Sequence, residues 1–128
     1  MRCCPSHHLP VHAVCVHLGL QESHRQRQLL RVCDLLRSFP AHEPVVLAGD
    51  FNDWRNRAHD ILHREAGLQE VFVQAFGRAV RTFPASMPLL ALDRIYVRNA
   101  AVHAPLSLPK KPWDKLSDHA PLAAEILL

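Results

Sequence analysis

Three short segments of this chain carry polar side chains of the types that phosphate chemistry uses. Residues 49–52 read GDFN, residues 92–96 read LDRIY, and residues 117–119 read SDH. Hydrolysis of a phosphoester requires charge neutralisation on the phosphoryl oxygens, a deprotonated water, and a leaving oxygen that is protonated or held by metal. Carboxylates, an amide and an imidazole can meet these needs. The three segments therefore indicate metal-assisted hydrolysis of a phosphoester.

The first segment contributes Asp50 and Asn52, two residues apart just after a short apolar run. Alternate residues of an extended chain face the same side, so both side chains can point at one place. The carboxylate can bind metal or orient water, and the amide can donate to a phosphate oxygen. Taken alone, however, such a tetrapeptide is more often a turn whose aspartate bonds nearby backbone.

The other two segments contribute Asp93 and the pair Asp118 and His119, which lies shortly before Pro121. The proline favours an extended backbone there. If Asp93 contacts one ring nitrogen of His119, it sets the tautomer and raises the basicity of the other nitrogen, which can then accept a proton from water. Taken singly, Asp93 with Arg94 is better explained as a surface ion pair, and His119 as a hydrogen-bonded core histidine.

His17 ends a run rich in β-branched residues at positions 11–17, which predicts a buried strand. A histidine at the carboxyl end of a strand can point into a shared cleft and serve as a phosphate ligand or general acid. The occurrence of all these residues in one chain, with elements of plausible length between them, favours the functional interpretation over a set of coincidences.

The surrounding pattern predicts a β-α-β-α order in the first half of the chain. A helix is expected over residues 23–38, with Ser23 and Gln26 as a capping box, followed by a strand at 45–48. Asp53 is expected to cap a second helix that ends before Gly67. Further on we expect an edge or lid segment at 71–73, a proline-rich active-site loop at 82–88, strands at 94–98, 102–108 and 123–128, and an exposed basic turn at 109–112.

Composition sets only broad limits on function. The 128 residues fit one domain, and the formal net charge of +3 is too small to argue for nucleic acid. No run is long and apolar enough for a membrane span and no secretory signal is visible, so we expect a cytoplasmic protein. A separate hypothesis is a zinc module at the amino terminus, built from Cys3, Cys4, His7 and His8.

Read in order, these three segments and residues 17–20 (HLGL) resemble the second half of the endonuclease/exonuclease/phosphatase superfamily. That group includes DNase I-like nucleases, sphingomyelinases and inositol polyphosphate phosphatases. The resemblance covers nearly all of residues 11–128 and leaves residues 1–10 as an irregular segment. It implies an α/β (α+β) fold that is half of a DNase I-like four-layer α/β sandwich, with one mixed, mostly antiparallel sheet and helices on one face.

The resemblance also implies roles for individual residues. His119 would be the general base or a phosphate ligand, Asp93 its orienting partner, and His17 a second phosphate-contacting histidine. The expected metal ligands are Asp50, Asn52 and Asp118, and the expected substrate contacts are Asn52, Arg94 and Trp54. The cofactor would be Mg²⁺ or Mn²⁺. The family's principal metal ligand is a glutamate of the first half, which Glu22 does not match, so metal binding is expected to be weak or absent if that glutamate is essential.

Two functional hypotheses follow. The first is a divalent-metal-dependent phosphoester hydrolase, of the phosphodiesterase, nuclease or phosphatase type, that uses in-line water attack with a His-Asp dyad. The alternative is a catalytically incomplete fragment that keeps the fold and acts only through self-association or a partner chain. In either case half of a sandwich would expose an apolar sheet face, so we expect a homodimer, or a partner that supplies the missing half.

Overall fold

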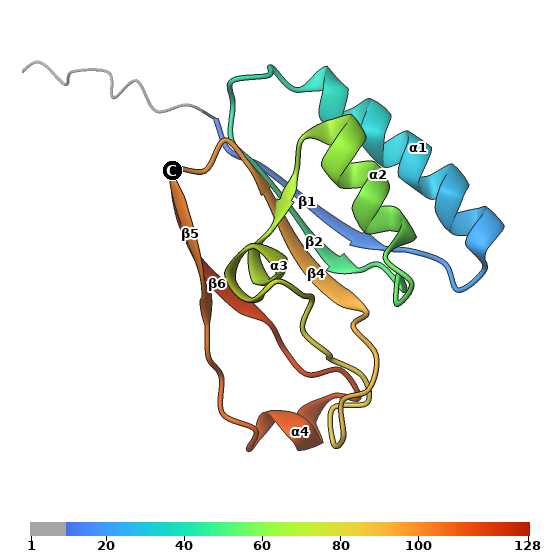
Figure 1. The fold of residues 1–128 in the computed structure, drawn as a ribbon, viewed down its shortest axis with the longest axis vertical. Coiled ribbons are helices and arrows are strands. Elements are labelled where there is room, and N and C mark those ends of the chain that lie inside the picture. The colour runs from blue at the N-terminus through green and yellow to red at the C-terminus, as the bar shows by residue number, and fades with distance from the viewer. Residues whose placement is uncertain (1–9) are drawn as a thin grey trace, which may run out of the picture.

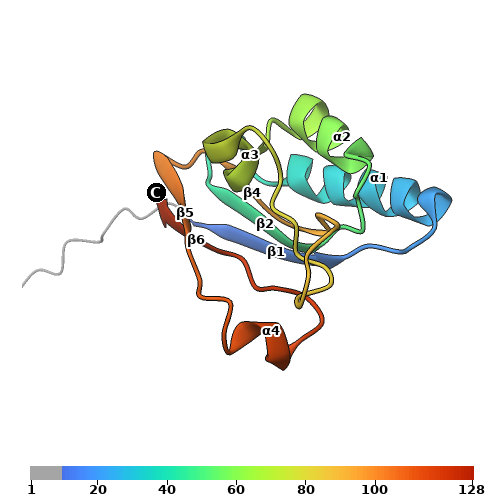
Figure 2. The ribbon, with the colours of Figure 1, turned by 60° about the horizontal axis from the view of Figure 1, so that its bottom comes forward.

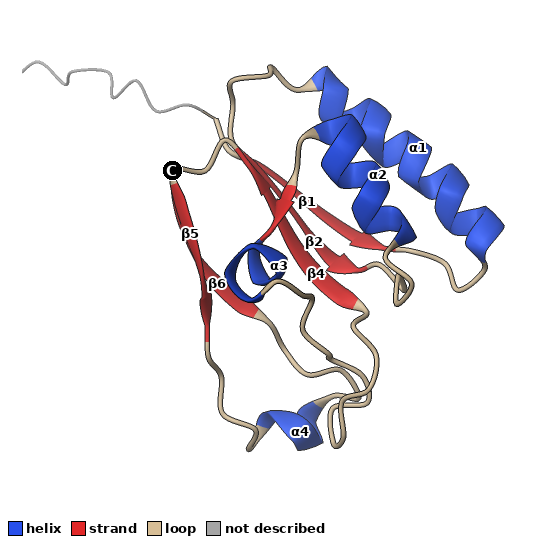
Figure 3. Ribbon diagram, viewed as in Figure 1, coloured by secondary structure: helices blue, strands red, loops and turns tan. Residues whose placement is uncertain are grey.

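The structure is a computed structural model that describes residues 10–128, so the four candidate zinc ligands at the amino terminus lie outside the described residues. The described elements, in chain order, are β1 (His12–His17), α1 (Glu22–Ser38), β2 (Val45–Asp50), α2 (Arg57–Ala66), β3 (Gln69–Glu70), α3 (Val71–Phe76), β4 (Asp93–Arg98), β5 (Val102–Leu106), α4 (Trp113–Leu116) and β6 (Ala123–Leu127). Figures 1 and 3 show their arrangement. No helix among residues 10–128 is long and apolar enough to cross a membrane.

A mixed sheet with strand order β1-β2-β4-β3 forms the centre of the fold. β1 and β2 are parallel, whereas β4 runs antiparallel to both β2 and β3. Parallel neighbours need a crossover connection, and α1 provides it. The mixed α/β fold expected from the sequence is confirmed, and the structure adds a second sheet in which β5 and β6 pair antiparallel.

One face of the central sheet is covered by α1 and α2, as Figure 2 shows. Alternate residues of the strands point toward these helices, because side chains of a strand alternate between its faces. The resulting core contains Leu29, Cys33 and Leu36 of α1, Leu62 of α2, and Val45, Leu47 and Tyr96 of the strands. All of these are nearly or fully inaccessible to solvent, so this side is a complete hydrophobic core.

The opposite face is only partly covered. Val71 and Phe72 of α3 pack with Val97 of β4, and three half-buried residues of the β6 segment, Leu122, Ala124 and Ile126, pack against this cluster. At the β1 edge of the same face, Ala13 and Cys15 are exposed. The apolar face expected from half of a sandwich is therefore smaller than the sequence suggested, because the second sheet covers the β4 side.

Three local predictions differ from the structure. α1 begins at Glu22, and its N-cap Gln21 makes no side-chain capping bond, so the predicted capping box is wrong. α2 begins at Arg57 after a left-handed Asn56, although the Asp53 carboxylate still accepts a bond of 2.9 Å from the His59 N–H.

The third difference concerns residues 71–73, which form the start of helix α3 instead of an edge strand or lid. The Glu70 carboxylate explains the helix start, because it accepts a hydrogen bond of 2.7 Å from the Val73 N–H. Burial raises the pKa of Glu70, although its bonds to backbone N–H groups oppose the shift. A six-residue helix is too short to leave a clear periodic pattern in the sequence.

Candidate active site

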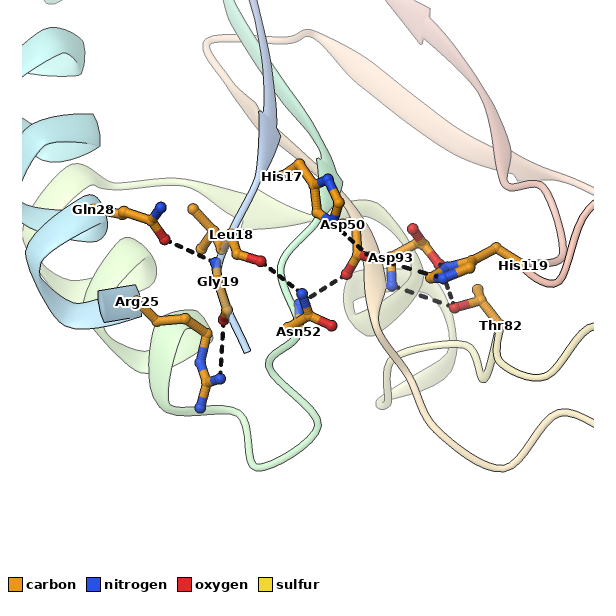
Figure 4. A network of polar contacts seen from close by, with 10 residues as sticks. All are labelled: His17, Leu18, Gly19, Arg25, Gln28, Asp50, Asn52, Thr82, Asp93 and His119. Atoms are coloured by element: carbon orange, nitrogen blue, oxygen red, sulfur yellow. Dashed lines mark hydrogen bonds and ion pairs between the residues drawn. The ribbon is translucent and has the colours of Figure 1, made fainter. Parts of the chain in front are cut away.

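Three polar residues form a row across three neighbouring strands. The register pairs His17 of β1 with Asp50 of β2, and Asp50 with Asp93 of β4. Residues in register on adjacent strands face the same side of a sheet. β4 is antiparallel, so its first residue lies at the same edge as the last residues of β1 and β2. The row therefore lies on the face opposite α1 and α2, because Leu47 and Tyr96, which are on the other face of β2 and β4, pack in the core beneath these helices. Figure 4 shows the row from close by.

His119 completes this row from the loop that precedes β6. Its Nδ1 lies 2.7 Å from Asp93 Oδ2, and its Nε2 lies 3.8 Å from Asp50 Oδ2. His17 Nε2 approaches the same Asp50 oxygen to 3.6 Å. The last two separations exceed a direct hydrogen bond, so both imidazoles border a gap in front of Asp50. The side chain of His17 is 80% exposed and that of Asp50 17%, so the gap opens to solvent.

Thr82 holds Asp93 in place. Its hydroxyl donates to Asp93 Oδ2 over 2.6 Å, and it also accepts a bond of 3.3 Å from the Asp93 N–H. The Thr82 carbonyl accepts from the Ala120 N–H over 2.7 Å, which ties the loop to the segment that carries His119. The role of this threonine could not be predicted from the sequence, because a lone threonine in a proline-rich segment gives no signal of its partner.

Asn52 lies next to Asp50 in the site and is itself buried. It adopts a left-handed backbone, with φ of 47°, and its N–H donates to Asp50 Oδ1 over 2.9 Å. Its side-chain nitrogen donates to the Leu18 carbonyl over 2.6 Å. The amide group has a second N–H and a carbonyl oxygen that are not used in these bonds.

Helix α1 anchors the loop that follows β1. The Gly19 N–H donates to Gln28 Oε1 over 2.8 Å, and the Arg25 guanidinium donates to the Gly19 carbonyl over 3.1 Å. Arg25 also donates to the Leu20 carbonyl. These bonds explain why two polar helix residues face inward, and they hold the backbone that positions Asn52.

A cleft of about 610 Å³ lies in front of the histidines. Its polar wall is formed by His17, Asp50, Asn52 and His119. Its apolar wall is formed by Leu20, Trp54, Phe83, Leu90 and Leu92. Five of the six residues predicted to be catalytic thus meet at one edge of the sheet, four of them lining this cleft and Asp93 bonded to His119.

Two of the predicted site residues are placed differently. The Arg94 side chain is 1% exposed and points away from the cleft, where its guanidinium donates to the carbonyls of Asp53 and Ala91 and to Asn56 Oδ1. The prediction of Arg94 as a substrate contact is therefore wrong, because strand alternation places it on the helix-covered face. Asp118 is exposed, and its carboxylate makes no hydrogen bond within residues 10–128.

The charges around His119 determine its protonation. Burial alone lowers the pKa of His119, but the hydrogen bond and charge of Asp93, with the charges of Asp50 and Asp118, outweigh it, so the pKa is raised above the ordinary value of 6.5. The protonated imidazole therefore stabilises the fold at pH below 6.5, and this contribution is lost as the pH rises through the folded-state pKa.

We expect the substitution Asp93→Asn to lower the pKa of His119, because it removes the nearest negative charge. The measurement is an NMR titration of the His119 ring proton in both proteins. Asp34→Asn, which removes an exposed carboxylate from the outer face of α1, is the matched control and should leave the titration unchanged. An unchanged His119 titration in the Asp93 variant would show that this pair is not electrostatically coupled.

Several of these groups could hold a metal ion. Asp50, Asp93 and His119 offer ligand atoms that lie within 4.8 Å of one another. Asp93 Oδ2 already accepts from Thr82 and pairs with His119, which leaves Asp50 as the carboxylate with most freedom to bind a cation. Oxygen ligands suit Mg²⁺ and Mn²⁺. The ligand atoms are therefore of the type that such an ion prefers. One carboxylate and the Asn52 amide, however, fill only part of its coordination shell.

The sheet, its covering helices and the cleft define a DNase I-like α/β fold. The chain belongs to the Endonuclease/Exonuclease/phosphatase family, which it matches over residues 6–119. It is 56% identical over 118 residues to the protein YbhP of Escherichia coli (strain K12), a match that covers 92% of this chain and 47% of YbhP. It is 35% identical over 121 residues to a UPF0294 protein of Vibrio cholerae, covering 92% of this chain and 38% of that protein.

Solved structures have the same fold. A conserved protein from Enterococcus faecalis V583 aligns with a TM-score of 0.70 at 24% identity, covering 95% of this chain and 52% of that one. D. rerio TDP2 complexed with a single strand DNA product aligns with a TM-score of 0.63 at 20% identity, covering 89% of this chain and 54% of that one. The chain thus spans about half the length of the relatives it matches.

Proposed function

We propose that this chain provides the catalytic dyad of a divalent-metal-dependent phosphoester hydrolase. The observation that carries the proposal is the pair formed by His119 and Asp93, 2.7 Å apart, whose second imidazole nitrogen lies 3.8 Å from Asp50 at the edge of the cleft. Membership of the Endonuclease/Exonuclease/phosphatase family supports the same chemistry. The converging groups favour an enzyme over the alternative of a catalytically incomplete fragment.

Each residue of the site has a distinct role in the proposed reaction. Asp93 accepts from Nδ1 of His119, so the neutral ring carries its lone pair on Nε2. A water held near Asp50 would lose its proton to that nitrogen as its oxygen attacks phosphorus. The bond between phosphorus and the leaving oxygen then breaks, and His17, if protonated, can donate a proton to that oxygen. The second N–H of the Asn52 amide can donate to a phosphoryl oxygen.

Asp50 and Asn52, joined by Asp118 if that exposed side chain turns inward, would hold Mg²⁺ or Mn²⁺. When bound, the ion supplies positive charge that neutralises the phosphoryl oxygens. Trp54 lines the cleft and is proposed as a substrate contact, with Asn52. The substrate class proposed at this level is a phosphoester, whether a nucleic acid, a lipid head group or a small molecule.

A pairing partner is a further proposal. A second copy of this chain, or a chain that supplies the half of the family domain beyond this one, would cover the exposed Ala13 and Cys15 of β1. The same face carries the row of His17, Asp50 and Asp93. A chain seated there could therefore also contribute metal ligands.

A cytoplasmic location is a separate proposal.

The function is tested by hydrolysis of bis(p-nitrophenyl) phosphate, a soluble phosphodiester, with p-nitrophenyl phosphate as the monoester comparison. We expect hydrolysis in Mg²⁺ or Mn²⁺ that is lost in EDTA. Asp50→Asn should lower the rate by about 100-fold or more, because it removes a charge that orients water and holds the ion.

Asp34→Asn is the matched control, since it neutralises an exposed carboxylate far from the cleft, and its rate should equal that of the wild type. Equal rates for Asp50→Asn and wild type would contradict the assigned site. A folded wild-type protein without turnover would instead favour the incomplete fragment.

A further inference from the structure

Large apolar side chains are exposed on three loops around the mouth of the cleft. Leu20, 82% exposed, follows β1, and Trp54, 51% exposed, follows β2. The loop before β4 adds Met87, Leu89 and Leu90, which are 66%, 56% and 37% exposed. Leu20, Trp54 and Leu90 also line the cleft itself. Figure 1 shows the loops after β1 and β2 at the right and the loop before β4 below them, next to α4. We call these five side chains the apolar rim.

From this arrangement we propose that the apolar rim docks the protein on an anionic lipid surface, so that the phosphoester it hydrolyses belongs to a membrane lipid. The inference rests on the proposed hydrolase function for its substrate, but the docking itself depends only on the rim. Single exposed apolar residues are common on soluble proteins, whereas a group that surrounds a substrate entrance indicates an interaction surface.

The loop before β4 is built to present its apolar tip. Residues 82–92 contain no charged side chain. Backbone bonds close the turn: the Leu89 N–H donates to the Phe83 carbonyl over 2.9 Å, and the Met87 N–H donates to the Pro84 carbonyl over 3.1 Å. Met87 and Leu89 therefore project from an ordered turn, which reduces the entropy lost when they insert into another phase.

Positive charge flanks the apolar rim. The Arg55 guanidinium lies 4.4 Å from the centre of the Trp54 ring. The exposed Lys110 and Lys111 precede α4, whose segment lines a pocket together with Ala85 and Pro88 of the same apolar loop. Leucine, methionine and tryptophan next to arginine and lysine is the composition of segments that lie at the surface of anionic membranes. This charge complementarity selects a lipid with negative head groups.

The side-chain types favour lipid over nucleic acid as the occupant. Binding of single strands relies on aromatic rings that stack with bases and on cations that follow the phosphates. Four of the five rim residues are aliphatic or thioether side chains, which cannot stack but do partition into acyl chains. Of the five rim residues, Trp54 alone has an aromatic ring that could stack on a base.

The docking is tested by binding to vesicles of phosphatidylcholine mixed with phosphatidylglycerol. The chain has two tryptophans, so Trp113→Phe leaves Trp54 as the sole fluorescent reporter. We expect its emission to shift to the blue on binding and to be quenched by brominated phosphatidylcholine. Sedimentation of the wild-type protein with the same vesicles gives an independent measure of binding.

The double substitution Met87→Asn with Leu89→Asn should weaken vesicle binding by about 100-fold, because each side chain contributes about tenfold on insertion. Neither residue lines the cleft, so hydrolysis of bis(p-nitrophenyl) phosphate should be retained. The matched control is Leu30→Asn with Leu35→Asn, which replaces two leucines of α1 that are 65% and 44% exposed and lie outside the rim. The control should bind vesicles as the wild type does.

The proposal is overturned if the wild type does not bind these vesicles, or if the rim and α1 variants bind equally. It is also overturned if the rim variant loses binding to a single-stranded oligonucleotide instead, or if it only dissociates a dimer. His119→Ala separates this inference from the proposed function, since it should bind vesicles and lose hydrolysis. Vesicle binding by a wild type that hydrolyses no phosphoester would remove the hydrolase assignment and leave the docking intact.

Discussion

His119→Ala is expected to lower the rate of phosphodiester hydrolysis by about 10³-fold, with a range of 10²–10⁴ for loss of a general base. The imidazole is the group whose Nδ1 is held by Asp93 and whose Nε2 faces the gap before Asp50. Alanine removes both contacts and leaves no side chain to accept the proton of the attacking water. Steady-state hydrolysis of bis(p-nitrophenyl) phosphate in Mg²⁺ or Mn²⁺ measures the effect.

The matched control for this substitution is His24→Ala, which removes an exposed histidine from α1 and should leave the rate unchanged. Asp93→Ala combined with His119→Ala should be little slower than His119→Ala alone, because two residues that act as a unit are strongly non-additive. Full additivity of the two effects would contradict the dyad, as would a wild-type rate for the His119 variant with its fold intact.

Gly49→Ala is expected to destabilise the fold by about 4 kcal/mol or more, the range of the most severe single substitutions. Gly49 has φ of +143°, and a Cβ built on it would lie 1.9 Å from the Val16 carbonyl oxygen. That oxygen belongs to the neighbouring parallel strand β1, whose Val16 pairs with Gly49. The methyl group can be admitted only by separating β1 from β2, which would also displace His17 and Asp50. Chemical denaturation measures the loss.

Gly67→Ala is the matched control for this prediction. Gly67 also has a positive φ, +64°, but nothing lies within 4 Å of its added Cβ. The control should therefore cost only the left-handed strain, about 1–2 kcal/mol. Similar losses in the two variants would show that backbone strain, and not the contact between β1 and β2, accounts for the effect at Gly49.

The central elements of the fold could be predicted from local patterns. The β-branched run at positions 11–17 and the apolar run at 45–48 both became strands, and the helix expected over residues 23–38 became α1. The run at positions 11–17 did not become the buried strand that was predicted, because β1 lies at the edge of the sheet and its side chains alternate between half-buried and exposed. The start of α3 could not be found in this way, because it depends on one carboxylate, that of Glu70, which caps a short helix.

The orientation of Arg94 illustrates a second limit. The family resemblance implied that Arg94 contacts the substrate, but Arg94 follows Asp93 in β4, and adjacent residues of a strand face opposite sides of the sheet. Asp93 consequently contacts His119, whereas Arg94 is buried under the loop that contains Asp53 and Asn56. A prediction that follows strand alternation strictly would have separated the two.

By itself the sequence determined which chemical groups this protein can use, since the carboxylates, the amide and the two histidines are recognisable from their types and from the strand ends that carry them. Only the tertiary structure decided which of them meet. The distance from His119 to Asp93 depends on a strand register, on a loop held by Thr82 and on the path of the chain before β6, all of which are contacts between residues far apart in sequence. Contacts of this kind arise when the whole core packs, so no local pattern encodes them.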